Sequence, residues 1–133
     1  MRTIAKVRYT AALMGFALCI SSVGIVDAAN FAGTWTFSAV MANATSAPVC
    51  VFRQAGNRIS GSCKGPNGIG SAIGAVSGDA IAFQWHIIAT NPRGLAGIAT
   101  YKGVWGSDGV VRGRWTHSAI PREVGTFTGQ KLQ

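Results

Sequence analysis

Two cysteines of this chain are placed symmetrically about a predicted hairpin turn, which restricts how the surrounding segments can pair. Gly56-Asn57 is a favoured two-residue hairpin loop, and it lies between two short runs of alternating apolar and polar residues. Pairing outward from that loop brings Cys50 directly opposite Cys63. The sequence therefore predicts an antiparallel hairpin with a cross-strand disulfide. By closing a short loop, this disulfide should stabilise the fold by roughly 3 kcal/mol.

Two further hairpins follow the same plan. The pairs around Gly78-Asp79 are Val76 with Ile81, Gly74 with Phe83 and Ala72 with Trp85. A third turn separates apolar from polar side chains only if it has three residues, 107–109, with Gly109 in the left-handed conformation. One face of that hairpin then holds Tyr101, Gly103, Trp105, Val111, Gly113, Trp115 and His117, and the other holds Lys102, Val104, Arg112 and Arg114.

The pattern of short strands predicts the fold class. No helical periodicity longer than one turn occurs after residue 30. Strands are expected over residues 33–39, 48–55, 58–65, 70–77, 80–89, 96–106, 110–118 and 124–132. Their shared apolar face has no helix to cover it, so the sheet must pack on itself or close, and sequential short hairpins favour closure. We therefore predict an all-β protein, an eight-stranded antiparallel up-and-down β-barrel.

The N-terminus has the three parts of a cleavable secretory signal peptide over residues 1–28. A basic start precedes an apolar run at residues 11–26, and Ala28 is the small residue expected before the cleavage site. The apolar run is shorter than the ~20 residues of a spanning helix, so we expect no membrane span in the mature chain. The sequence thus predicts a secreted or periplasmic protein with one β-barrel domain over residues 29–133.

The charge of the chain limits its partners. Residues 1–28 hold three of the 12 basic and one of the four acidic residues, so the remaining 105 residues carry a net charge of +6. A basic surface favours anionic partners such as acidic polysaccharide, lipopolysaccharide or nucleic acid. The basic residues are scattered, however, and mark no specific nucleic-acid site. Only Arg112 and Arg114 lie together, which makes them the candidate for an anionic surface site.

The residues that carry chemistry do not indicate an enzyme. Glycoside hydrolysis needs two carboxylates that flank the bond, and Asp79 and Asp108 are better explained as turn formers. No nucleophile elbow marks a Ser–His–acid triad. The two histidines of the chain, His86 and His117, lie on separate expected strands, so a zinc site is not expected. We predict no catalytic residue, no metal site and no cofactor.

The inward face of the barrel is the candidate binding site. Its ring-bearing residues are Trp35, Phe83, Trp85, Tyr101, Trp105, Trp115 and His117. An eight-stranded barrel is just wide enough either to fill with side chains or to hold one small ligand, and the sequence leaves both possibilities open. Glycines at the inward positions 61, 74, 103 and 113 are consistent with open space or with rings that lie beside them.

Gly33-Thr34-Trp35, at the start of the first expected strand, resembles the Gly-x-Trp start of calycin-type barrels, the group that includes lipocalins and avidins. In that group a basic residue near the end of the last strand commonly packs over the tryptophan, and Lys131 stands in a suitable place. Avidins are similar in size, but Phe37 and Met41 occupy the positions of their biotin-contacting Asn and Ser. The resemblance therefore implies an avidin-like or lipocalin-like fold without implying biotin binding.

A second resemblance is to bacterial inhibitors of secreted metalloproteases, which are exported calycin-like barrels with one disulfide and an N-terminal arm that enters the protease cleft. Residues 29–32 could form such an arm. Two functions are therefore expected as alternatives. One is a non-catalytic binding protein for an unidentified small ligand, and the other is an extracytoplasmic protein-interaction or protease-inhibitor module.

Overall fold

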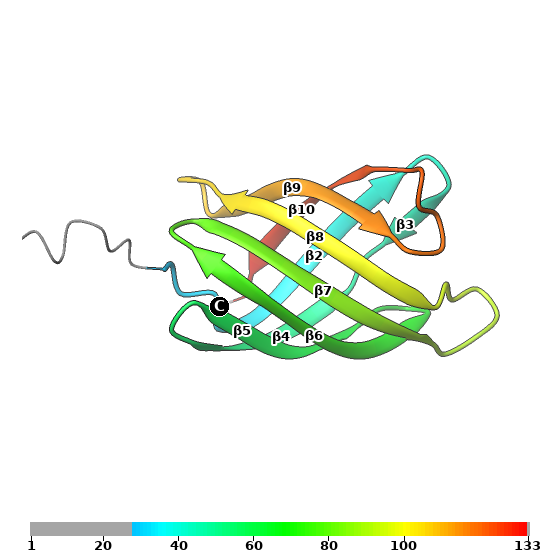
Figure 1. The fold of residues 1–133 in the computed structure, drawn as a ribbon, viewed down its shortest axis with the longest axis horizontal. Helices are drawn as coiled ribbons and strands as arrows, with labels where there is room; N and C mark the ends of the chain where they lie inside the picture. Colours follow the sequence, from blue (N-terminus) through cyan, green and yellow to red (C-terminus); the bar gives the residue numbers. More distant parts are fainter. Residues whose placement is uncertain (1–27, 133) are drawn as a thin grey trace, which may run out of the picture.

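The computed structural model describes residues 28–132 as a barrel of antiparallel strands, and this part of the chain contains no helix (Figure 1). Residues 1–27 of the predicted signal peptide and residue 133 lie outside the described residues. The strands are β2 (Gly33–Met41), β3 (Ala44–Ser46), β4 (Val49–Ala55), β5 (Arg58–Lys64), β6 (Gly68–Ser77), β7 (Ala80–Ala89), β8 (Gly97–Trp105), β9 (Val110–His117) and β10 (Gly125–Lys131). The described residues accordingly provide no helix that could cross a bilayer.

The barrel closes because β10 pairs with β2 as well as with β9. Both β3 and β4 pair with β2 in one continuous register, so together they form a single interrupted barrel strand. The interruption falls at Pro48, which has no N–H to donate to the ladder, although its carbonyl oxygen accepts a hydrogen bond from the Phe37 amide at 3.0 Å. The predicted eight-stranded antiparallel barrel is confirmed, with β3 as an addition that the sequence did not predict.

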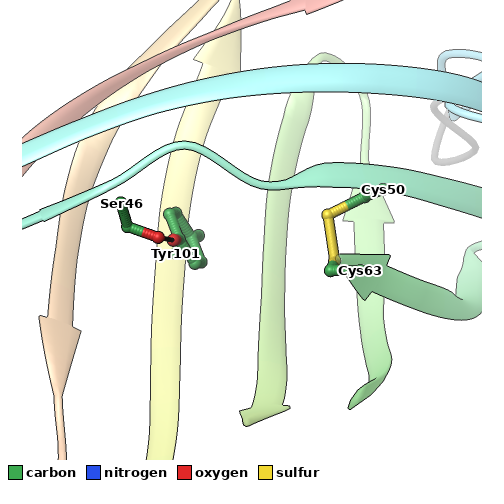
Figure 2. Close-up of a disulfide and its surroundings, with 4 residues drawn as sticks. All are labelled: Ser46, Cys50, Cys63 and Tyr101. Carbon is green, nitrogen blue, oxygen red and sulfur yellow. Dashed lines mark hydrogen bonds between the residues drawn. A yellow bond between two sulfur atoms is a disulfide. The ribbon is translucent and has the colours of Figure 1, made fainter. Parts of the chain in front are cut away.

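The two hairpins with two-residue turns have the predicted registers. Phe52 lies opposite Gly61 and Cys50 opposite Cys63 in the β4–β5 ladder, while Gly74 lies opposite Phe83 and Ala72 opposite Trp85 in the β6–β7 ladder. The Cα atoms of Cys50 and Cys63 are 4.0 Å apart, and a disulfide joins the two residues (Figure 2). The alternation of side chains about a glycine-containing turn was therefore sufficient to fix these pairings.

The β8–β9 hairpin also has the predicted register. Trp105 lies opposite Val111 and Tyr101 opposite Trp115. The turn is closed by a hydrogen bond from the Gly106 amide to the Val110 carbonyl oxygen at 2.9 Å, and Gly109 has a φ of 83°. The three-residue loop thus places the tryptophans on the inner face of the hairpin.

The connections at the two ends of the barrel differ in length (Figure 1). The short-turn end has the turns at residues 56–57, 78–79 and 106–109. The long-loop end has the two longest connections, at residues 90–96 and 118–124, beside short ones at residues 42–43 and 65–67. The chain enters the first barrel strand at the short-turn end, which leaves the longer connections free to shape the opposite end.

Lys131 lies directly opposite Trp35 in the ladder between β10 and β2. Its Nζ donates a hydrogen bond to the Asn30 carbonyl oxygen at 3.3 Å, and its side chain passes close to Gly33, which has a φ of 121°. A basic residue of the last strand therefore packs beside the Gly-x-Trp sequence at the start of the first strand. This arrangement and the strand order are compatible with a calycin-like small barrel and identify no particular member of that group.

Candidate functional site

The interior residues that the sequence singles out are separated along the barrel axis, and two of them close the short-turn end. The rings of Trp35 and Trp105 lie 5.1 Å apart between centroids, and Phe31 packs against them at 5.4 Å and 4.9 Å respectively. Phe31 and Trp35 are fully buried. The three rings pack on one another, so Trp35 and Trp105 form an apolar plug at this end of the barrel.

Gln54 forms hydrogen bonds that hold residues 29–31 against the short-turn end of the barrel. Its Oε1 accepts a hydrogen bond from the Phe31 amide at 2.7 Å, and its Nε2 donates to the Ala29 carbonyl oxygen at 2.9 Å. The Ala29 amide in turn donates to the Gly78 carbonyl oxygen at 2.9 Å. Residues 29–32, which could have formed an inhibitor arm, are therefore held against the barrel through Phe31 and Ala29.

Phe83 and Tyr101 lie in the middle of the barrel, where aromatic side chains fill the space. Their rings stack with centroids 4.8 Å apart. Phe52 approaches Phe83 at 5.1 Å, Phe127 approaches Tyr101 at 5.1 Å, and Phe37 lies 5.3 Å from Phe83. All five residues are buried. The middle of the barrel is therefore a packed core.

The inward glycines accommodate this core instead of opening it. A Cβ at Gly74 would collide with the Ala82 carbonyl oxygen and the Phe83 side chain, and a Cβ at Gly103 would lie 2.9 Å from the Phe127 ring. The same test at Gly61 and Gly113 meets the backbone of the neighbouring strand. Of the two interpretations that the sequence left open, the structure supports glycines that make room for neighbouring strands and rings.

The remaining three interior residues wall a pocket of about 650 Å³ at the long-loop end. Trp85 comes from β7, and Trp115 and His117 come from β9. Other lining residues include Ala39, Ser46, Asn67, Ile87, Arg93 and Leu95. The volume lies within the range of small-molecule sites, about 300–1,000 Å³. The barrel thus combines a closed end, a filled middle and a hollow at the other end.

Trp85, whose side chain is 3% exposed, lines this pocket, but its indole N–H is buried from solvent and has no hydrogen-bond partner within residues 28–132. By contrast, Nε1 of Trp115 donates to the Val40 carbonyl oxygen at 3.1 Å. An unsatisfied buried donor is uncommon and costs about 1–3 kcal/mol. A Cβ built on Gly70, which does not line the pocket, would lie 3.4 Å from Nε1 of Trp85, so Nε1 lies close to β6. A ligand oxygen that moved in beside it would remove the cost of the unpaired donor.

Both ring nitrogens of His117 have backbone partners. The Ala119 amide donates to Nδ1 at 3.0 Å, so Nδ1 carries a lone pair. In the neutral ring the proton is then on Nε2, which lies 3.0 Å from the Leu95 carbonyl oxygen and donates to it. His117 therefore joins the loop at residues 90–96 to the connection after β9. Its ring can contribute a flat wall to the pocket, while its nitrogens are already used.

Tyr101 connects the packed core to the pocket. Its hydroxyl donates a hydrogen bond to Oγ of Ser46, at a distance of 3.5 Å (Figure 2). Burial raises the pKa of Tyr101 to about 12, and the hydrogen bond with Ser46 offsets part of that rise. Tyr101 is therefore a neutral phenol at physiological pH, and the Ser46 hydroxyl that it contacts belongs to the pocket wall.

The two arginines proposed for an anionic surface site differ in their surroundings. Arg112 forms a bidentate ion pair with Asp108, with Nη2 to Oδ2 at 2.8 Å and Nη1 to Oδ1 at 3.2 Å. This pairing lowers the pKa of Asp108 and raises that of Arg112. Arg114 is exposed and lies opposite Lys102 in the β8–β9 ladder. The structure thus gives Arg112 an internal counter-ion and leaves Arg114 beside another cation.

The sequence did not identify several residues of the pocket wall. Ser46, Asn67 and Leu95 lie on β3 or on connections, where no alternation of apolar and polar residues marks an inward position. Among the described residues, no three His, Cys, Asp or Glu side chains come together as metal ligands would. No protein-family model matches the chain, and no curated protein matches it significantly.

Proposed function

We propose that this protein is an exported, non-catalytic binding protein that holds a small ligand in the pocket at the long-loop end. The observation that carries this proposal is the pocket of about 650 Å³ walled by three buried rings, one of which, Trp85, has an N–H without an acceptor among residues 28–132. Binding sites are typically concave and mostly apolar, with a few polar groups that orient the ligand. The pocket walled by Trp85, Trp115 and His117 is concave and combines these rings with polar groups, among them Ser46, Asn67 and Arg93.

The pocket favours a flat, partly apolar ligand that carries an oxygen acceptor. Trp115 and His117 offer ring surfaces whose polar atoms are already bonded to the backbone. Trp85 offers a donor, and Arg93 adds a positive charge at the exposed loop between β7 and β8. An anionic acceptor such as a carboxylate or sulfonate would complement both groups.

The disulfide supports the part of the proposal that concerns export. Disulfides persist in oxidising compartments and are rare in the cytosol, and Cys50 and Cys63 are bonded across the β4–β5 ladder. Together with the signal-peptide pattern of residues 1–28, this bond favours a periplasmic or extracellular location. The hydrogen bonds that hold Ala29 and Phe31 disfavour the alternative of a protease inhibitor with a free N-terminal arm.

Titration with anilinonaphthalene sulfonate, a flat apolar probe that carries a sulfonate, tests the proposed function. The probe should bind the folded protein and increase in fluorescence. Trp85→Phe keeps a ring but removes the donor, so it should weaken binding by about fivefold, the equivalent of one lost hydrogen bond of ~1 kcal/mol.

Trp105→Phe is the matched control, because it makes the same chemical change at the closed end of the barrel. It should leave the affinity for the probe unchanged within about twofold. Absence of binding to the folded protein, or equal weakening by both substitutions, would contradict a site beside Trp85.

A further inference from the structure

The outer surface of the barrel carries a line of basic residues that form no salt bridge within residues 28–132. Arg58 lies opposite Ala75, which lies opposite Ala82. Ala82 lies opposite Lys102, which lies opposite Arg114. This line, here called the basic row, runs across β5, β6, β7, β8 and β9 with two alanines at its centre.

The basic row borders a groove of about 800 Å³ on the outer surface. Ala75 and Ala82 are too small to fill the space between Arg58 and Lys102, which lie three strands apart, or about 14 Å at the usual strand spacing. Arg53 and Ile73 also line the groove, and Ile73 is 56% exposed. In the described part of the chain no acidic residue belongs to the lining of the groove.

The charges of the basic row are unfavourable for the barrel by itself. Like charges directly opposite each other on adjacent strands destabilise a sheet, and Lys102 faces Arg114 in this way. Within residues 28–132 the salt bridge found is that of Arg112 with Asp108, so it does not involve Lys102 or Arg114. An external anion would relieve this repulsion.

We propose that the groove binds a linear acidic polysaccharide along the basic row. Cations spaced over about 14 Å suit a polymer with regularly repeated anionic groups better than a single small anion. Sugar rings have apolar faces that can lie on Ala75, Ala82 and Ile73. The aromatic residue that borders the groove, Phe83, is buried in the core, so the groove lacks the stacking platform on which single-stranded nucleic acids depend.

This site is separate from the pocket at the long-loop end, since it lies on the opposite side of the barrel wall and shares no lining residue with that pocket. The two proposals can therefore fail independently. Trp85→Phe should weaken binding of the aromatic probe and leave polysaccharide binding unchanged.

Calorimetric titration with a sulfated, uronate-containing oligosaccharide from heparin tests the proposal. The double variant Arg58→Gln, Lys102→Gln should bind at least about tenfold more weakly, because two charge-assisted contacts are lost. The dependence of log Kd on log salt concentration should also fall by about two, one for each cation removed. Both residues are exposed, and the near-ultraviolet circular dichroism spectrum should confirm that the variant is folded.

The control is Lys64→Gln, Arg122→Gln, which removes the same charge from exposed positions outside the groove. It should weaken binding by less than about threefold, as screened charges at a distance do. Equal losses in the two double variants, tighter binding of single-stranded DNA of equal length, or no binding of the oligosaccharide would each overturn the proposal.

Discussion

The carbonyl oxygen of Phe31 accepts a 3.0 Å hydrogen bond from Nε1 of Trp35, and the two rings stack with centroids 5.4 Å apart. A residue that precedes the first barrel strand is therefore part of the core. Phe31→Ala should lower the free energy of unfolding by about 3–5 kcal/mol, as other large truncations in cores do. Urea denaturation measures this loss. The control is Leu132→Ala, a change at a half-exposed residue, which should lower the free energy of unfolding by less than about 0.5 kcal/mol. An equally small loss for Phe31→Ala would contradict the conclusion that Phe31 is part of the core.

The disulfide between Cys50 and Cys63 closes a loop with a sequence separation of 13 residues. Replacing both cysteines with alanine should lower the free energy of unfolding by roughly 3 kcal/mol, chiefly because the unfolded chain gains freedom. Urea unfolding of the oxidised protein and of the variant provides the comparison. Mass spectrometry of unreduced protein from its native compartment should find the two cysteines joined, and two free thiols there would refute the prediction.

Gly109 adopts a φ of 83°, and a Cβ built on it would meet nothing within 4 Å. A substitution there is therefore penalised by the backbone conformation and not by crowding. Gly109→Val should cost well over 1 kcal/mol, because β-branched residues fit the left-handed region worst, whereas Gly109→Asn should cost less. Equal stability of the two variants in thermal unfolding would show that the turn does not require this conformation.

Tyr101 should titrate with a midpoint near pH 12, because burial raises its pKa to about 12. In a protein that begins at residue 29, Tyr101 is the single tyrosine, so the ultraviolet absorbance of phenolate reports on it alone. An unfolded tyrosine has a pKa of about 10. Between pH 10 and 12 the unfolded chain therefore loses a proton that the folded protein keeps.

Stability that is fully present below pH 10 should consequently decline as the pH rises to 12, by about 3 kcal/mol in total. Ser46→Ala should shift the midpoint upward, since the hydrogen bond with Ser46 lowers the pKa of Tyr101. A phenolate midpoint near pH 10 in folded protein would contradict the burial of this hydroxyl.

The sequence predicted the hairpins because their determinants are local. Gly56-Asn57 and Gly78-Asp79 fix where the chain reverses, and period-two alternation then fixes every pair that follows. The short strand β3 escaped prediction because Pro48 interrupts the ladder between β3 and β4. The residues around β3 also show no strong alternation of apolar and polar side chains.

The site could be predicted only in part. Alternation assigns Trp35, Tyr101 and Trp85 to the same inner face, but it does not reveal their heights along the barrel axis. Those heights depend on the registers of all the ladders together. In the β7–β8 ladder the strands are joined by a long loop, and in the β2–β10 ladder they come from opposite ends of the domain, so neither register can be derived from a short turn. The basic row went unrecognised for the same reason, since Arg58 and Lys102 become neighbours of one groove only after two intervening strands are placed.

If the hollow beside Trp85 is a ligand site, a crystal structure of protein purified from its native host should show what occupies it. We expect electron density for a small molecule between Trp85, Trp115 and His117, with an acceptor atom within hydrogen-bonding distance of Nε1 of Trp85. Side chains from the surrounding loops that fill this space, or a backbone acceptor on Nε1 of Trp85 in an otherwise empty hollow, would contradict the proposed ligand site.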